Sequence, residues 1–350
     1  MLSFIAKRFF SGFMIIVGVV IVVFFLFFAL PGDPVSMMVG QRTDDITREA
    51  IRKELGLDQS LPAQLYLYFR DLSPVSIHKD TPQEQQKYDY TSLLCFGESV
   101  LVLKVPYLRR SFQTNRKVSE IIGEKLILTV ILALAAMFFA TIVGISLGVM
   151  AALRQNTFWD HFIVTNSVVG ISTPSFVAAS LVSLFFGYML GPYLGLNGIG
   201  SLFVTGIDGR ELHLENLILP AFTLGIRPLA IIVQLTRSSM LEVLSQDYIR
   251  TAKAKGLSYY KVIFKHALKN ALNPVITAIS GWLASLLAGA FFVERIFDYK
   301  GLGYETIQAV YNLDLPIVIG ATLIVASFFV VVNIIVDLLY ALVDPRVRLR

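Results

Sequence analysis

The sequence is poor in cysteine and in charged residues. Cys95 is the only cysteine among 350 residues, so no disulfide can form within the chain. Asp, Glu, Lys and Arg make up 16% of the residues, against about 25% in a typical soluble domain. Hydrophobic residues make up 55%. This balance excludes an ordinary soluble domain and indicates a protein that crosses the membrane several times.

The sequence also lacks the residue patterns of a catalytic or metal site. The four histidines are far apart and show no metal-ligand spacing: His78, His161, His213 and His266. No Gly-x-x-x-x-Gly-Lys-Ser/Thr loop for nucleotide phosphates is present. The segment Gly144–Gly148 fits the Gly-x-Ser-x-Gly pattern of hydrolases, but in an apolar run the same spacing favours close helix packing. We predict no catalytic residue, no metal ligand, no cofactor and no enzymatic activity.

Long apolar runs dominate the rest of the chain. A membrane-spanning helix takes about 20 mostly apolar residues, and six runs qualify: Phe9–Leu30, Leu126–Leu153, Phe162–Leu190, Leu217–Leu235, Pro274–Ile296 and Leu315–Val343. The third and sixth are long enough to be tilted or broken. The first exceeds the apolar core of a signal peptide, about 7–15 residues, and we interpret it as a retained helix. The predicted fold class is an all-α polytopic membrane protein with six transmembrane helices.

The basic residues favour one orientation of these helices. The short outer loops hold only Arg210 and Lys300. The segments on the other side hold Lys7, Arg8, Arg154, a cluster between Arg237 and Lys269, and the arginines at 346, 348 and 350. Because basic residues mark cytosolic loops, the N- and C-termini are predicted to be cytosolic. The formal net charge of +5 is explained by these short segments, so nucleic-acid binding is not expected.

This topology divides the chain into four parts. They are a first transmembrane helix (1–30), an extracytoplasmic segment (31–125), a five-helix core (126–343) with a cytosolic loop (237–273), and a cytosolic tail (344–350). Within the extracytoplasmic segment we predict helices over Asp44–Leu55 and Leu61–Leu72, and a polar loop over Ser73–Tyr90. The apolar run Leu93–Val105 is too short to span a membrane, and either strands or an interfacial element would fit it.

Several sequence blocks together resemble one family of membrane proteins. The blocks read LPGDP, KELGLDQSLPAQ, SFQTNRKVSEIIGEKLIL, LPAFTLGIRPLAIIVQLTRSSMLEVL, GAFFVERIFDYKGLG and NIIVDLLYALVDPRVRLR, in this order along nearly the whole chain. They resemble the permeases of binding-protein-dependent ATP-binding-cassette importers, in the branch for dipeptides, oligopeptides and nickel. Against the usual length of that family, about 35 residues at 73–107 are in excess. The extracytoplasmic loop between helices 1 and 2 is therefore predicted to be enlarged.

The resemblance implies a function as well as a fold. It implies a six-helix type I importer permease in the cell inner membrane, forming half of a translocation pathway for peptides. The implied partners are a homologous second permease, two ATPase subunits, an extracytoplasmic solute-binding protein and membrane lipids. Nickel or another small peptide-like solute is an alternative cargo. A self-contained secondary transporter with Arg227 and Asp337 as an ion relay is a further alternative, but the sequence shows none of the internal repeats common in such transporters.

The segment Asp247–Pro274 is a basic loop between two apolar spans. Its sequence predicts two short helices, capped by Ser245 or Asp247 and by Ser258, with a break at Gly256. In the second helix an apolar stripe is predicted: Tyr260, Ile263, Phe264, Ala267, Leu268 and Ala271. Periodicity alone favours a helix resting on lipid, whereas the family resemblance implies contact with the ATPase.

The resemblance identifies eight residues of this loop as ATPase-coupling: Arg250, Thr251, Ala252, Lys253, Ala254, Lys255, Gly256 and Leu257. In other importers a Glu-Ala-Ala triplet stands six residues before the glycine. Here that triplet is Arg250-Thr251-Ala252, which puts a salt-bridging role of the glutamate in doubt.

Three residues are candidates for the translocation path. Arg227 is a charge in the middle of an apolar span beside Pro228, and such charges often mark substrate or ion pathways. A structural role, pairing with a carbonyl or an acid of another helix, is equally compatible with this pattern. Ser172 and Ser175 flank Pro174 in a serine-rich span, which fits either a wet cavity or small-residue packing.

Overall fold

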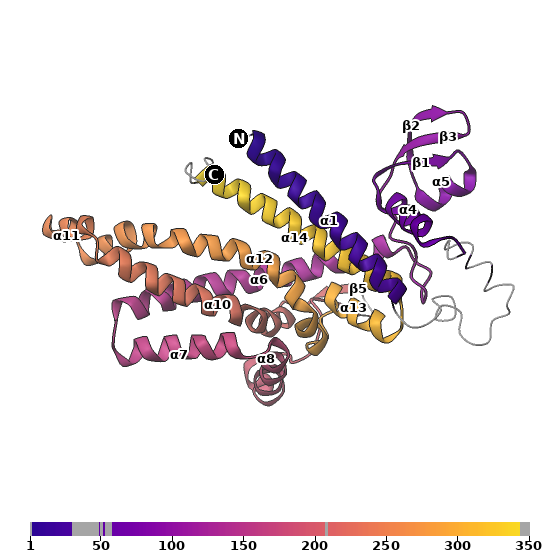
Figure 1. Ribbon diagram of the computed structural model, residues 1–350. Helices are drawn as coiled ribbons and strands as arrows, with labels where there is room; N and C mark the ends of the chain where they lie inside the picture. Colours follow the sequence, from indigo (N-terminus) through magenta and orange to yellow (C-terminus); the bar gives the residue numbers. More distant parts are fainter. Residues whose placement is uncertain (1, 30–48, 50–51, 53–57, 207–208, 344–350) are drawn as a thin grey trace. The chain divides into compact units, whose positions relative to one another are not determined.

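The computed structural model describes residues 2–29, 49, 52, 58–206 and 209–343 (Figure 1). The chain forms two compact units. One consists of Met1–Glu124 with Thr306–Val330, and the other of Lys125–Glu305 with Val331–Arg350. The predicted helix Asp44–Leu55 lies outside the described residues except for Glu49 and Arg52.

Long apolar helices make up most of the described residues. Four are long and apolar enough to cross a membrane, namely α1 (Leu2–Ala29), α6 (Val118–Leu153), α10 (Glu215–Leu244) and α14 (Leu315–Val343). Two bent pairs raise the number of spans to six if each pair is one span. Each of the six apolar runs predicted from the sequence coincides with one of these helices or pairs.

The first bent pair lies where the sequence predicts a long or broken helix. The helix α7 (Phe158–Ser172) meets α8 (Ser175–Val182) and the π-helix η1 (Ser183–Met189) at an angle of 111°. Pro174 separates them, because proline lacks a backbone donor and disfavours the helical conformation of the residue before it. The sixth run, in contrast, forms the single helix α14.

The second bent pair joins Lys261–Leu286 to Ala290–Ile296. The first arm contains the π-helix η2 (Lys261–Leu268) and most of α12 (Lys269–Ile296), and the second arm is the end of α12. The remaining helices are short: α4 (Leu61–Leu72), α5 (Pro82–Tyr88), α9 (Gly191–Leu194), α11 (Asp247–Ala254) and α13 (Leu302–Tyr311). The predicted helix Leu61–Leu72 is confirmed by α4. Within the first unit, α4 packs on α1 through Tyr68, Val20 and Phe24.

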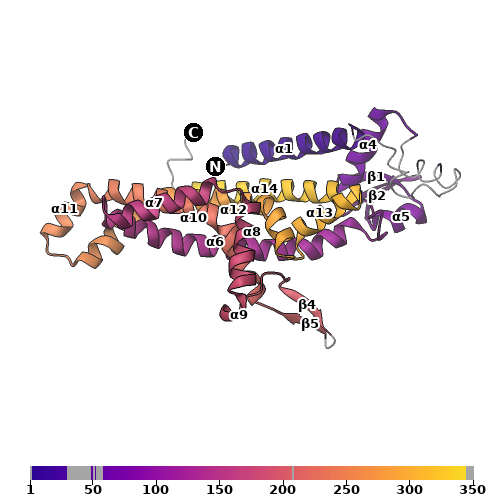
Figure 2. The ribbon, with the colours of Figure 1, turned by 90° about the horizontal axis from the view of Figure 1, so that it is seen from below.

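The all-α fold class needs a correction, because the structure contains two small antiparallel sheets. Strands β1 (Val75–Lys79), β2 (Thr91–Phe96) and β3 (Ser99–Leu103) form a sheet in the order β1-β3-β2. Strands β4 (Phe203–Gly206) and β5 (Gly209–Leu212) form a hairpin. In Figure 2 this hairpin and the α8–α9 segment stand away from the line of α7 and α10. The fold is therefore mainly helical, with strands in the apolar run Leu93–Val105.

The polar loop predicted over Ser73–Tyr90 is wrong, because this range holds β1 and α5. On β1 the polar residues Ser76 and His78 face inward, while Val75 and Ile77 are exposed. The His78 ring is held between Ser76 Oγ at 2.9 Å and Glu84 Oε2 at 2.8 Å. The strand is thus stabilised by buried hydrogen bonds, which the usual apolar alternation does not reveal.

A buried lysine completes the interior of this small sheet. The Nζ of Lys104 donates to the carbonyl of Asp71 at 2.9 Å and lies 4.3 Å from the centre of the Tyr88 ring. The Tyr88 hydroxyl donates to Asp71 Oδ1 at 2.8 Å. Burial lowers the pKa of Lys104 to about 8. The sheet and α4 are therefore joined by a polar network as well as by apolar packing.

Candidate functional site

Three tight contacts hold the helices of the second unit together. The first is between α6 and α10. A Cβ added at Gly144 would lie 2.8 Å from Ile232, and one added at Gly148 would lie 2.6 Å from Thr236. The Gly144–Gly148 pattern therefore lets two helices approach closely, as the sequence analysis favoured, and lies inside α6 rather than at a hydrolase turn.

The second contact joins the start of α7 to α10. The fully buried carboxylate of Asp160 accepts two hydrogen bonds from Arg237, from Nε at 2.5 Å and from Nη2 at 2.7 Å. It also accepts from the backbone N–H of Asn156 at 2.9 Å. Such a bidentate pair fixes the relative position of two helices more firmly than a single hydrogen bond.

The third contact is centred on Glu294 in α12, whose side chain is fully buried. Its carboxylate accepts from the Thr129 hydroxyl of α6 at 2.6 Å and from the Tyr304 N–H at 2.9 Å. The same Thr129 oxygen accepts from the Leu302 N–H at 2.8 Å. A Cβ added at Gly301 would lie 2.6 Å from the carboxylate. The block GAFFVERIFDYKGLG therefore encodes one buried carboxylate and a glycine turn that wraps around it.

Sequence reasoning did not single out Glu294. The signal was present, because an acidic residue near the end of an apolar helix requires a buried partner. The glycines at 301 and 303 were also a signal, because glycine lets the backbone approach a buried carboxylate closely. No pattern in the sequence connects Glu294 with Thr129, which lies 165 residues earlier and donates a hydrogen bond to its carboxylate.

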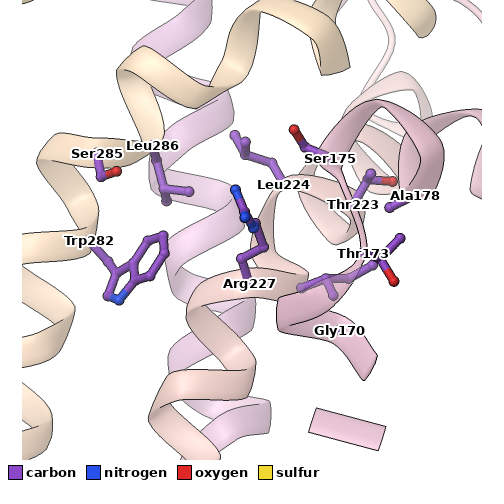
Figure 3. Close-up of a pocket in the computed structure, with 11 residues that line it drawn as sticks. Gly170, Thr173, Ser175, Ala178, Thr223, Leu224, Arg227, Trp282, Ser285 and Leu286 are labelled. Carbon is purple, nitrogen blue, oxygen red and sulfur yellow. The ribbon is translucent and has the colours of Figure 1, made fainter. Parts of the chain in front are cut away.

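These helices surround a small cavity at the break between α7 and α8 (Figure 3). Its volume is ≈ 60 Å³. The lining comes from three helical segments: Gly170, Thr173, Ser175 and Ala178 from the broken span, Thr223, Leu224, Ile226 and Arg227 from α10, and Trp282, Ser285 and Leu286 from α12. Arg227 extends between the α12 residues and the residues of the broken span.

The structure brings together two of the three predicted pathway residues. Arg227 and Ser175 both line the cavity, whereas Ser172 does not. The hydroxyl of Ser172 donates to the carbonyl of Val168 at 2.9 Å, within its own helix. Sequence reasoning missed Trp282, because a tryptophan in an apolar span has no pattern that distinguishes a cavity wall from lipid-facing packing.

The guanidinium of Arg227 makes no hydrogen bond or ion pair with any residue that the structure describes. Neither the carbonyl partner nor the acidic partner considered from the sequence is present among these residues. Of the residues that line the cavity, Arg227 alone carries a formal charge. The cavity therefore presents an accessible positive charge among hydroxyl groups and apolar side chains.

The basic loop forms a second candidate site at one end of the same unit. It consists of α11, a turn at Gly256 and the helix that leads into η2. Gly256 has a φ of +74°, as predicted for a glycine break. Its N–H donates to the carbonyl of Lys253 at 3.0 Å, which closes the end of α11.

The loop is packed firmly on the helices from which it projects. Ile249 and Ala252 of α11 are buried against Val262, Ile263 and Met240. Of the eight predicted coupling residues, only Ala252 is buried, and the other seven are exposed. The loop therefore presents a basic face on a rigid base.

One detail of the sequence-based description of the loop, the cap of its first helix, is wrong. The N-cap of α11 is Gln246, with no side-chain cap, while the Ser245 hydroxyl donates to the carbonyl of Glu242. The residues of the predicted apolar stripe divide into two sets: Ile263, Ala267 and Ala271 are buried, whereas Tyr260 is 74% exposed and Phe264 57% exposed. The π-helical register of η2 contributes to this division, since i→i+5 bonding rotates successive side chains differently from an α-helix.

Two protein-family models match this chain. The model described as "Binding-protein-dependent transport system inner membrane component" matches residues 144–349, and the model of the N-terminal part of such membrane components matches residues 1–133. The chain belongs to this family. As a member of a family of transport-system membrane components, it is a transport subunit.

Curated relatives match this membrane component over its full length. It is 33% identical over 364 residues to the dipeptide transport system permease protein DppB of Alkalihalophilus pseudofirmus, covering 99% of this chain and 100% of the relative. It is 38% identical to the di/tripeptide transport system permease protein DppB of Pseudomonas aeruginosa, covering 99% of each. It is 36% identical to the dipeptide transport system permease protein DppB of Escherichia coli K12, again covering 99% of each.

Proposed function

We propose that this chain is the permease subunit of an ATP-driven peptide importer and forms one half of its translocation pathway. The observation that carries the proposal is the similarity, over 99% of the chain, to dipeptide and di/tripeptide permeases. The partners are a homologous second permease, two ATPase subunits and an extracytoplasmic solute-binding protein. ATP is hydrolysed by the ATPase subunits, because the sequence contains no phosphate-binding loop of its own.

The proposed fold is a type I importer permease with six spans. Each bent pair then counts as one crossing, which the apolar length of each pair supports. The termini and the loop at 237–273 are cytosolic, on the basis of the basic residues in the short loops. The sheet β1-β3-β2 lies on the outer side of the inner membrane, in the enlarged loop at 31–125.

In this arrangement the basic loop is the docking element for an ATPase. The seven exposed residues from Arg250 to Leu257 form its contact face, and Gly256 defines the turn at its centre. Docking onto another protein requires a surface that transmits force without deforming. The buried contacts of Ile249 and Ala252 with Met240 of α10 supply that rigidity. Among the described residues, Arg250 pairs with Asp247 alone, at 3.3 Å and with both side chains exposed, so its charge remains available to a partner.

The cavity at the α7–α8 break is the proposed part of the translocation pathway, with Arg227 and Ser175 in its wall. Ser172 is the last residue of α7 and is assigned to the pathway on sequence grounds alone. An accessible charge within a membrane-spanning helix is costly unless it faces water or a polar ligand. The cavity that Arg227 lines lies at a helix break, which supports a water-accessible surface between the helices rather than a lipid-facing one.

Cross-linking tests the proposed docking directly. A chain carrying Cys95→Ser and Lys255→Cys is expressed with its partner subunits and treated with a short, membrane-permeant thiol–amine cross-linker. We expect a cross-linked product between Lys255→Cys and an ATPase subunit. Because Lys79 is exposed on β1, on the proposed outer side, Lys79→Cys is the matched control and gives no such product. Cross-linking of the ATPase from Lys79→Cys but not from Lys255→Cys would contradict the proposal.

A further inference from the structure

Arg227 is a basic side chain in a membrane-spanning helix, and no described residue pairs with it. The residue lies within α10, directly before Pro228, in a helix long and apolar enough to cross a membrane. A positive charge within a membrane-spanning helix is costly unless it meets water or a polar partner. The described residues offer it no acid and no carbonyl. The charge is therefore available to an anionic group from outside the chain.

The hydroxyl groups around Arg227 fit the same kind of group. Thr173 and Thr223 donate to the carbonyls of Val169 and Leu219 in their own helices, each at 2.8 Å. The hydroxyls of Ser175 and Ser285 make no hydrogen bond with a described residue and remain free to donate. The cavity thus holds one cation and two uncommitted donors, and no carboxylate that would bind an ammonium group.

The size of the cavity limits what enters it. A volume of ≈ 60 Å³ accommodates a carboxylate but not a whole dipeptide. Trp282 and Leu286 close one side, and the residues at the α7–α8 break close the other (Figure 3). One end of an extended molecule can therefore be bound while the rest remains in the space between the spans.

We propose that Arg227 binds the C-terminal carboxylate of the transported peptide through a bidentate hydrogen-bonded pair, with Ser175 and Ser285 as additional donors. This inference rests on the proposed function as a peptide permease. The guanidinium fork matches a carboxylate, and the pair is stronger than a neutral hydrogen bond. The permease itself then selects for a free C-terminus and is indifferent to the N-terminus, because the cavity contains no acidic group.

The test compares a dipeptide with its C-terminal amide and with its N-acetyl derivative. Each cargo is first titrated against the solute-binding protein, and uptake into proteoliposomes is measured with that protein saturated. In the unaltered permease we expect the free dipeptide and the N-acetyl dipeptide to be transported about tenfold or more faster than the amide, as loss of a charged hydrogen-bonded pair implies. In Arg227→Gln we expect the free dipeptide to fall to the rate of the amide, and the amide to be unchanged.

Two variants separate recognition from structure. Arg227→Lys keeps the charge but loses the fork, so we expect an intermediate preference for the free carboxylate. Arg154→Gln removes an exposed arginine outside the cavity and is expected to leave both rates unchanged. Equal rates for dipeptide and amide in the unaltered permease would overturn the assignment of Arg227 while leaving peptide import intact. An equal proportional loss of the uptake rate for the free dipeptide and for the amide, in both Arg227→Gln and Arg227→Lys, would also overturn this assignment. Absence of ATP-dependent uptake of every peptide would instead refute the proposed function.

Discussion

Replacing Gly256 by aspartate or valine is expected to leave the chain folded and inserted but to reduce coupled transport at least tenfold. The space around Gly256 is open, with no atom within 4 Å of an added Cβ, so the side chain itself fits. The backbone does not, because a φ of +74° costs a valine roughly 1–2 kcal/mol. Aspartate tolerates this conformation better, but it places a negative charge beside Lys253 and Lys255, on the face proposed to contact the ATPase.

The measurement is peptide uptake together with peptide-stimulated ATP hydrolysis in the purified complex. Both rates should fall together, while the solute-binding protein still binds its cargo. Gly256→Asn is the matched control, because asparagine adopts positive φ readily and carries no charge. We expect it to retain most of the activity. Normal coupling in Gly256→Asp would show that this loop does not transmit between permease and ATPase.

Replacing Glu294 by alanine is expected to destabilise the membrane component by about 3 kcal/mol or more. The substitution removes a buried acceptor and leaves the Thr129 hydroxyl and the Tyr304 N–H without their partner. It also empties the space between α12 and the glycine turn, since a Cβ at Gly301 would touch this carboxylate. We therefore expect a large fall in the thermal midpoint of the detergent-solubilised protein, and little protein in the membrane.

Glu305 offers a matched control in the same unit. Its carboxylate lies 3.6 Å from Lys125 Nζ, and the two side chains are 25% and 26% exposed. Partly solvated pairs of this kind contribute about 1 kcal/mol or less. Glu305→Ala should therefore change the thermal midpoint much less than Glu294→Ala. Glu294→Gln keeps one acceptor oxygen and should lie between them. Equal stability of Glu294→Ala and Glu305→Ala would show that the buried carboxylate is not a structural centre.

The sequence predicts the apolar helices well, because hydrophobic length is a strong and local signal. It also locates Arg227, since a charge within an apolar run is conspicuous, and the turn at Gly256. It does not predict β1, because Ser76 and His78 occupy the buried face of that strand, where they bond to each other and His78 also bonds to Glu84 of α5. The polar interior of the sheet is formed by contacts such as those of Lys104 with Asp71 and Tyr88. The hydrophobic periodicity of the sequence does not predict such contacts.

The same distinction applies to the candidate sites. The loop could be outlined from residue types alone, but residue types do not show which residues of its apolar stripe are buried, because the π-helical register of η2 leaves Phe264 exposed. For the cavity, Arg227 and Ser175 were found in the sequence, whereas Trp282 and Ser285 are ordinary residues of an apolar helix. They become part of the site only because α10 and α12 pack together.

The most direct test of peptide import is uptake of a labelled dipeptide into proteoliposomes. The vesicles contain this chain, its partner permease and both ATPase subunits, with ATP on the ATPase side and the solute-binding protein on the other. We predict accumulation that requires ATP, the binding protein and all four membrane-bound subunits. Accumulation of the dipeptide by this chain alone, driven by an ion gradient and without the ATPase subunits, would contradict the account and identify a secondary transporter.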